Sequence, residues 1–206
     1  MLTMKRLSQE EFTVADSATR FDIYAGIHKA LRAMMMETLR ATGCADVHDA
    51  SELHAVYEGV LELADTCATH LEHENEFIHP LLEATRMGSS ARIATEHTHH
   101  LAALANLCDA AASLRICTTG PEREKAAHAL YRELALFVGE NFTHMYVEET
   151  EHNRVLWASF SDDELRALER RIAASLPPEE SQQIMRWMVP AMTPAERAML
   201  LRAKMK

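Results

Sequence analysis

Two short stretches, His70-Leu-Glu-His-Glu74 and His144-Met-Tyr-Val-Glu148, share one spacing, in which a glutamate follows a histidine by four residues. On an α-helix, residues four apart lie on one face, one turn from each other. Each stretch therefore places an imidazole beside a carboxylate. Taken alone, such a pair is more often part of a solvated helix face than a set of metal ligands, so its position in the helix matters.

Both glutamates fall on the apolar face of a predicted helix. Glu74 is in phase with Cys67, Leu71, Ile78 and Leu81, and Glu148 is in phase with Phe137, His144 and Val155. An ionised carboxylate inside a core costs several kcal/mol unless it is paired or bound to a metal. The predicted inward faces carry no Arg or Lys to pair with these acids, which favours a metal.

Four segments around these pairs have apolar residues every three or four positions, which is the period of an α-helix. The first predicted helix covers about residues 17–40 and ends at Thr42-Gly43, and the second begins at the Asp49 cap. Breaks at residues 87–90 and 118–121 delimit the third helix and precede the fourth. Four long amphipathic helices with short connections predict an all-α fold, an antiparallel up-down-up-down four-helix bundle with short additional C-terminal helices.

The chain divides into three parts: an N-terminal lead-in at residues 1–16, the bundle at residues 17–160 and a C-terminal helical extension at residues 161–206. Capping-box residues at Ser161–Glu164 and Thr193–Glu196 predict two or three short helices in the extension, folding back on the bundle. The expected buried face of these helices consists of Trp187, Met188, Met192, Met199 and Leu200.

Two further histidines, His28 and His97, lie on the apolar stripes of the first and third predicted helices. A lone histidine on an apolar face is more often a satisfied core residue than a ligand. In an antiparallel pair, however, residues equally far from the turn lie at one height. The midpoints of positions 28 and 70, of 74 and 97, and of 97 and 144 all fall at predicted turns. The spacing therefore brings His or Glu from all four helices to one level inside the bundle.

The predicted metal ligands are His28, His70, Glu74, His97, His144 and Glu148. Four imidazoles and two carboxylates suit two cations, because a carboxylate can bridge neighbouring ions and spread the charge. Mixed nitrogen and oxygen ligation fits iron or manganese, with zinc as a further alternative. A structural zinc site needs only four ligands and usually includes Cys.

In this order and spacing, the six residues resemble the hemerythrin-like (HHE cation-binding) family. The flanking stretches HENEFIHPLL, TEHTHHLAAL and HMYVEETEHNRVL are similar to that family as well, and the resemblance covers about residues 17–160. It implies a four-helix bundle with a non-haem di-iron centre. In that family the histidines are terminal ligands, the two carboxylates bridge the irons, and O₂, NO or a peroxide binds at an open position.

The sequence departs from the oxygen-carrying hemerythrins at two places. Those carriers have a second histidine one turn after the third-helix histidine, where this chain has Leu101, and His100 is either a substitute or a bystander. They also have Asp five residues after the fourth-helix histidine, where this chain instead has Glu148 at the fourth position. The related iron–sulfur repair proteins carry Cys in an N-terminal segment, and residues 1–20 contain none.

Other candidate residues rank lower. The phase of His73, His79 and His99 points away from the stripes, so we expect these histidines at the surface. Cys67 either packs in the core or lies just behind the ligands. Tyr24, one turn before His28, is expected to pack in the core, with a hydrogen bond to a bound group as the alternative.

The chain has 21 basic and 31 acidic residues and a formal net charge of −10. So acidic a protein is not expected to bind nucleic acid or an anionic membrane. The N-terminus lacks the apolar run of a signal peptide, and no apolar stretch approaches the roughly 20 residues needed to cross a bilayer. The four Cys form no Cys-x-x-Cys pair, and a reducing cytoplasm is the expected compartment.

Three functions are compatible with these features. The first is a binding protein whose di-iron site takes up O₂ or NO, or holds iron, in sensing or stress handling. The second is an enzyme that turns over a small oxidant or delivers iron to damaged iron–sulfur clusters. The third is a structural protein stapled by metal, whose C-terminal helices dock a partner or a second copy. Binding is favoured over catalysis because no general acid or base beyond the ligands can be named.

Overall fold

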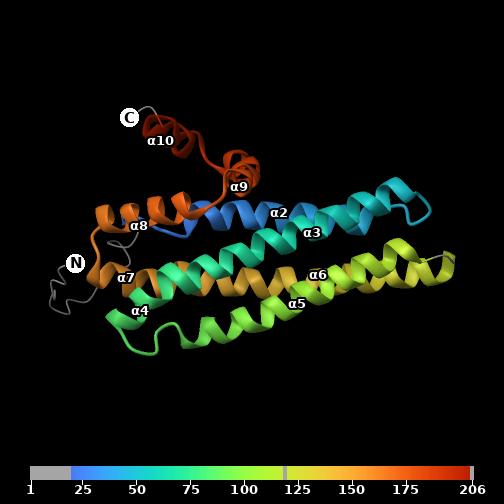
Figure 1. The fold of residues 1–206 in the computed structure, drawn as a ribbon, viewed down its shortest axis with the longest axis horizontal. Coiled ribbons are helices and arrows are strands. Elements are labelled where there is room, and N and C mark those ends of the chain that lie inside the picture. Colours follow the sequence, from blue (N-terminus) through green and yellow to red (C-terminus); the bar gives the residue numbers. More distant parts are fainter. Residues whose placement is uncertain (1–19, 118–119, 205–206) are drawn as a thin grey trace.

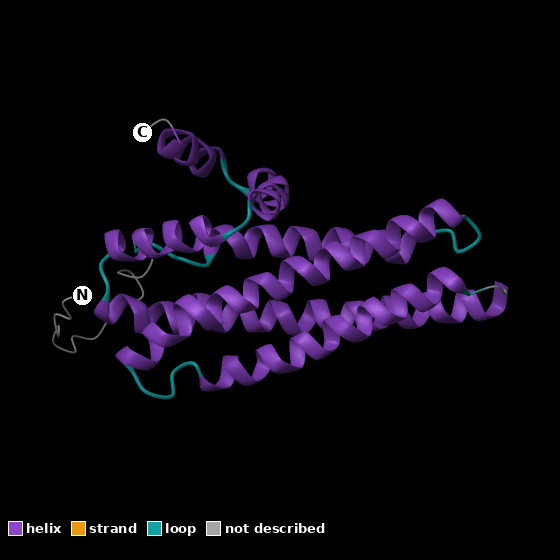
Figure 2. Cartoon of the chain, viewed as in Figure 1, coloured by secondary structure: helices purple, strands orange, loops and turns teal. Residues whose placement is uncertain are grey.

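The computed structural model describes residues 20–117 and 120–204, and the described chain consists of helices joined by loops, without a strand (Figure 2). The predicted lead-in at residues 1–16 lies outside the described residues. The elements are α2 (Ala25–Cys44), α3 (Ala50–His73), η1 (Glu74–Ile78), α4 (His79–Thr85), α5 (Ala91–Ile116), α6 (Gly120–Val147), η2 (Glu148–His152), α7 (Asn153–Ser159), α8 (Asp162–Ser175), α9 (Pro178–Ala191) and α10 (Pro194–Lys204). The all-helical class predicted from the sequence is confirmed.

The four longest helices, α2, α3, α5 and α6, lie side by side along the long axis of the molecule (Figure 1). Each packs against two of the others: α2 contacts α3 and α6, and α5 contacts the same two helices. No helix in the described part of the chain is long and apolar enough to cross a membrane.

The apolar core is divided into two clusters. The larger fills the middle of the four long helices and includes Leu31, Met35, Leu63, Leu107, Leu134 and Phe137. The smaller lies at the end where α4, α7 and α8 pack, and includes Ile23, Ile78, Leu82, Leu156, Trp157 and Leu165. Along the chain, His28 falls between Tyr24 and Leu31, Glu74 between Cys67 and Ile78, and Glu148 between Met145 and Leu156. One residue of each flanking pair belongs to the larger cluster and the other to the smaller. The folding of the chain therefore places a polar layer between two apolar ones.

Two π-helices interrupt what the sequence predicted as uninterrupted helices. η1 joins α3 to α4, and η2 joins α6 to α7. A π-turn holds more residues than an α-turn, so the apolar stripe beyond it moves by one position. Leu82 and Leu156 are fully buried, whereas Leu81 and Val155, the predicted core residues, are half-buried.

The boundaries of the helices follow capping chemistry in part. The side chain of Asp49 accepts hydrogen bonds from the backbone N–H groups of Ser51 and Glu52, as expected for the N-cap of α3. Thr42-Gly43, in contrast, does not end α2, which continues to Cys44. Gly43 instead permits close approach of α6, because a Cβ at this position would lie 2.7 Å from Cε2 of Tyr131.

The C-terminal extension forms three helices, α8, α9 and α10. The capping box of Ser161 and Glu164 is present at α8, and Thr193 and Glu196 exchange the corresponding hydrogen bonds at α10. α9 packs against α2, and α10 lies outside the four long helices (Figure 1). The prediction of a buried face was therefore wrong for Met199, which is 64 % exposed. The other four residues of that face, Trp187, Met188, Met192 and Leu200, are half-buried.

Candidate metal centre

The structure brings all six predicted ligand residues together in the polar layer. The contributing elements are α2 (His28), α3 (His70), η1 (Glu74), α5 (His97), α6 (His144) and η2 (Glu148). Their side chains are at most 2 % exposed, apart from that of His70 at 10 %. All four long helices therefore converge on one buried cluster of imidazoles and carboxylates.

The ligand atoms form two overlapping groups, each with its atoms within 4.8 Å of one another. One group consists of His28, His70, Glu74 and Glu148, and the other of Glu74, His97, His144 and Glu148. Both glutamates belong to both groups. In the first group, Nε2 of His70 lies 3.2 Å from Oε1 of Glu74. In the second, Nε2 of His144 lies 3.3 Å from Oε1 of Glu148.

Several polar atoms of this cluster have no hydrogen-bond partner in the described structure. They are both carboxylate oxygens of Glu74 and of Glu148, together with Nε2 of His28 and of His70. A buried polar atom without a partner costs roughly 1–3 kcal/mol, and more when it is charged. A metal ion bound among these atoms would remove that cost, because each of these residues belongs to a group of atoms close enough together to hold an ion.

The second pair of imidazoles points to the same conclusion. Nε2 of His97 lies 3.2 Å from Nε2 of His144, and each of these nitrogens also faces a glutamate oxygen. Two ring nitrogens this close can share a single proton, or they can both direct lone pairs at a cation. The buried His and Glu groups could therefore hold metal ions.

Three of the four imidazoles are oriented from behind through Nδ1. The partner of His28 is Oε1 of Glu149 at 3.0 Å, that of His144 is Oε2 of Glu96 at 2.9 Å, and that of His97 is Oδ1 of Asn75 at 2.9 Å. An Nδ1–H donated to such an acceptor leaves Nε2 unprotonated and pointing inward. Histidines that bind metals almost always have a partner of this kind.

The two outer carboxylates are themselves held by arginines. Arg32 donates two hydrogen bonds to Glu149, at 2.6 and 3.0 Å, and Arg92 donates one to Glu96 at 2.8 Å. Although partial burial opposes ionisation, the hydrogen bonds from His28 and Arg32 lower the pKa of Glu149 to about 2. This carboxylate is therefore charged at neutral pH and stabilises the donating form of His28.

The pKa values of the two inner glutamates are shifted in opposite directions. Although burial opposes ionisation of Glu148, hydrogen bonds from His144 and His97 hold the pKa of this carboxyl well below its ordinary value. Burial raises the pKa of Glu74 well above its ordinary value, and the neighbouring carboxylate of Glu148 adds to the effect. Two carboxylates in one buried layer repel each other when both are charged. Cations between them would reverse the sign of this interaction.

Two histidines in the layer were missed from the sequence. His79 was expected at the surface, but it is 7 % exposed, and His152 is 2 % exposed. Together with Glu148 they form a third group of ligand atoms within 4.8 Å. His79 is in α4, just beyond η1, and the π-turn rotates it inward relative to an uninterrupted α-helix. The available signal was the recurrence of a histidine four or five residues after each glutamate.

His100 and Leu101 lie on different sides of α5 relative to the cluster. His100 is buried with its ring 4.7 Å from that of His144, but it belongs to none of the three ligand groups. Burial lowers the pKa of His100 to about 4, so this ring is neutral at pH 7. Leu101, where oxygen carriers have a histidine, is 40 % exposed and faces away from the layer.

The remaining candidates have structural surroundings of their own. His99 is exposed as predicted, and His73 is half-buried. Cys67 belongs to the larger core cluster, where burial raises the pKa of its thiol to about 12. The ring of Tyr24 stacks on that of His28 at 5.2 Å, and its hydroxyl lies 3.3 Å from Nδ1 of His152. Tyr24 therefore both packs in the core and has a polar partner at the layer.

Comparisons with protein-family models, curated proteins and solved structures find no significant match to this chain. The interpretation of the cluster as a metal centre therefore depends on its geometry and on the chemistry of its residues.

Proposed function

We propose that this chain is a metal-binding protein whose buried cluster holds a non-haem di-iron centre inside an up-down-up-down four-helix bundle. The observation that carries the proposal is the set of buried glutamate oxygens without hydrogen-bond partners, facing imidazole nitrogens whose far sides are already held by acceptors. The short connections after α2 and α5, and the packing of each long helix on two others, support the topology.

Two cations fit the layer better than one. Glu74 and Glu148 each belong to both main ligand groups, so each has one carboxylate available to two neighbouring positions. Each position then has two histidines of its own, with charge supplied by the shared carboxylates. Mixed imidazole and carboxylate ligation, without Cys in any group, supports iron, with manganese or zinc as the competing metals.

We infer that the centre serves to bind O₂ or NO, or to store iron, in sensing or stress handling. When bound, reduced iron supplies an electron-rich position for a small neutral ligand. The chain's own contribution is to hold the imidazoles in one orientation, to keep the two carboxylates together, and to exclude water with an apolar cluster on either side.

A di-iron enzyme acting on small oxidants is the second candidate function. It is favoured by one observation: Tyr24, His79 and His152 form a further buried polar group beside Glu148. The hydroxyl and imidazole groups of these side chains lie next to the cluster and can exchange protons. A site that only binds a ligand reversibly does not need such groups. Turnover of an oxidant with an electron donor would distinguish this function from reversible binding.

The proposal is tested by loading the full chain with ferrous iron under anaerobic conditions and counting bound iron. Glu74→Gln keeps the size of the side chain but removes its charge, and is expected to lose most of the iron. The matched control is Glu72→Gln, two residues away on the exposed face of α3, which is expected to bind as the parent does. Equal iron content in both variants would refute the proposal. In the parent, spectra recorded after adding O₂ and NO are expected to show new charge-transfer bands.

A further inference from the structure

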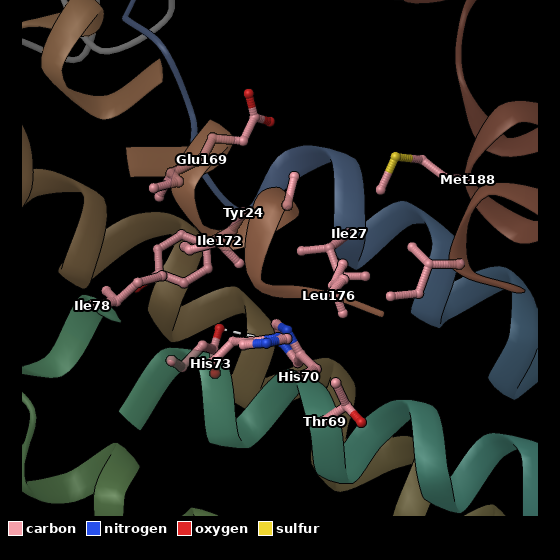
Figure 3. Close-up of a pocket in the computed structure, with 14 residues that line it drawn as sticks. Tyr24, Ile27, Thr69, His70, His73, Ile78, Glu169, Ile172, Leu176 and Met188 are labelled. Atoms are coloured by element: carbon pink, nitrogen blue, oxygen red, sulfur yellow. Dashed lines mark ion pairs between the residues drawn. The ribbon is translucent and has the colours of Figure 1, made fainter. Parts of the chain in front are cut away.

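An apolar pocket lies between the C-terminal extension and the bundle, and its inner end reaches the metal centre. The pocket has a volume of about 130 Å³ and is lined from α2, α3, η1, α8 and α9 (Figure 3). Two of the candidate ligands, His70 and the buried Glu74, belong to its lining. The side chains of Ile27, Ile172, Leu176, Ile184 and Met188 form its walls.

Among the six candidate ligands, the residue with the most accessible side chain, His70, lines this pocket. His70 is 10 % exposed, whereas the other five ligand side chains are at most 2 % exposed. Figure 3 shows His70 and His73 on one side of the pocket and Ile27, Leu176 and Met188 opposite them. A molecule that reaches the centre with little rearrangement therefore passes between these walls.

The lining determines which molecules fit. Aliphatic side chains dominate it, and the carboxylate of Glu169 points away from His70 (Figure 3). A cavity of about 150 Å³ with an aliphatic and aromatic lining stays dry and binds benzene or xenon. A charged solute loses its hydration in such a space without compensation.

We propose that this pocket is a binding site for small uncharged apolar molecules, up to about the size of benzene, and their entry route to the metal centre. In this proposal, α8 and α9 of the C-terminal extension form one wall of the pocket and limit the size of the molecules that enter it. The entry role rests on the proposed metal function, whereas binding of a molecule in the pocket does not. Diatomic gases and small hydrocarbons share the required chemistry, so the test uses a probe of each size.

The experiment compares two neighbouring residues of α8. Ala173 lines the pocket, whereas Ala174 does not, and both are exposed enough to accept a larger side chain. Ala173→Phe is therefore the blocking variant and Ala174→Phe its matched control. Full-length zinc-loaded protein with labelled Ile and Met methyl groups is titrated with benzene and with pressurised xenon. We expect the methyl signals of Ile27, Ile172, Ile184 and Met188 to shift in the parent and the control, and not in Ala173→Phe.

The possible results distinguish three properties: the size of the ligand, its binding in the pocket and its entry to the metal centre. Shifts with xenon alone restrict the pocket to diatomic ligands, and shifts with both probes extend it to small hydrocarbons. The absence of shifts with either probe, or equal shifts in both variants, would overturn the pocket as a binding site. In iron-loaded protein, Ala173→Phe is expected to slow NO association by about tenfold relative to Ala174→Phe. Equal rates would overturn the entry role. If the chain takes up no iron but its methyl signals still shift, only the metal function is refuted and the pocket remains a binding site.

Discussion

At the scale of single residues, the orientation of the imidazoles is the property that most distinguishes this cluster from an ordinary buried polar layer. Glu149, Glu96 and Asn75 each contact Nδ1 of a different histidine. Such partners fix the ring and increase its basicity as a ligand. None of the three was predicted from the sequence. A polar residue on the outer edge of a helix has the pattern of a solvated residue, and its contact with a histidine becomes evident only when the neighbouring helix is known.

The first prediction concerns one of these partners. Glu149→Ala removes the acceptor of His28 and the ion-pair partner of Arg32, and is expected to lower iron affinity by about 10–100-fold. Competition with a chelator of known affinity measures the change. The control is Glu151→Ala, at an exposed position two residues away. Similar iron affinities in the two variants would show that orientation through Glu149 is unimportant.

At the scale of elements, the two π-helices explain what sequence periodicity revealed and what it missed. A constant helical period predicted the side chains up to Glu74 and Glu148 correctly as inward-facing. Beyond each glutamate the helical period changes. The sequence therefore predicts Leu81 and Val155 in the core, whereas their neighbours Leu82 and Leu156 are the buried residues. The π-turns begin at the two glutamates themselves, and π-bulges occur frequently at functional sites.

The second prediction is that removing one residue from η1 disrupts the centre. Glu76 is exposed. Deleting it shortens the π-turn of η1 to the number of residues in an α-helical turn, and α4 therefore rotates about its axis. Leu82 and His79 then leave the interior, at an expected cost of about 2–5 kcal/mol, as for loss of a large core side chain. Chemical denaturation measures this cost against Glu76→Ala, which keeps the register. If the deletion and the substitution have equal stability, η1 does not set the register.

The third prediction concerns the loop between α4 and α5. The carboxylate of Glu83 accepts hydrogen bonds from the backbone N–H groups of Gly88 and Ser90 and from the Ser90 hydroxyl. The Ser90 side chain and the two N–H groups lower the pKa of Glu83 to about 2, from an ordinary value of 4.5. The unfolded chain therefore binds this proton at higher pH than the folded chain. The stabilisation is complete above about pH 4.5 and is lost as the pH falls towards 2.

The measurement for this loop is the free energy of unfolding of Glu83→Ala at pH 6 and at pH 3. We expect the variant to be less stable than the parent at pH 6, with a smaller difference at pH 3. Glu133→Ala, at an exposed position of α6, serves as the control and is expected to show no such change. A difference for Glu83→Ala that is independent of pH would show that the charge of this carboxylate does not hold the loop.

At the scale of the whole molecule, the polar layer that carries the candidate ligands joins all four long helices between two separate apolar clusters. The sequence predicted this convergence because turn positions and helical spacing together fix the height of each residue in a bundle. It did not predict how the extension packs. The apolar residues of α9 and α10 are spaced as in a buried helix, although none of those at positions 178–202, where burial is described, is fully buried. That difference depends on the direction that the linkers at residues 176–177 and 192–193 give to the chain.

The fourth prediction follows from the position of the layer. An ion that binds only the folded chain stabilises it by about 2.7 kcal/mol when its free concentration is 100 times Kd. For a chain of this size, this corresponds to a Tm higher by about 5–10 °C. Calorimetry of the iron-loaded chain before and after addition of a chelator measures the shift, and Glu74→Gln is expected to show none. A parent Tm that is indifferent to the chelator would count against the metal as a structural link between the helices.

The proposed centre holds two cations that share Glu74 and Glu148 as ligands in this layer. Diffraction from crystals of the iron-loaded chain, recorded on either side of the iron absorption edge, tests it most directly. Two anomalous peaks are expected, one beside His28 and His70 and the other beside His97 and His144, with both glutamates between them. A layer without an anomalous peak, a single peak, or iron bound only elsewhere on the chain would contradict it.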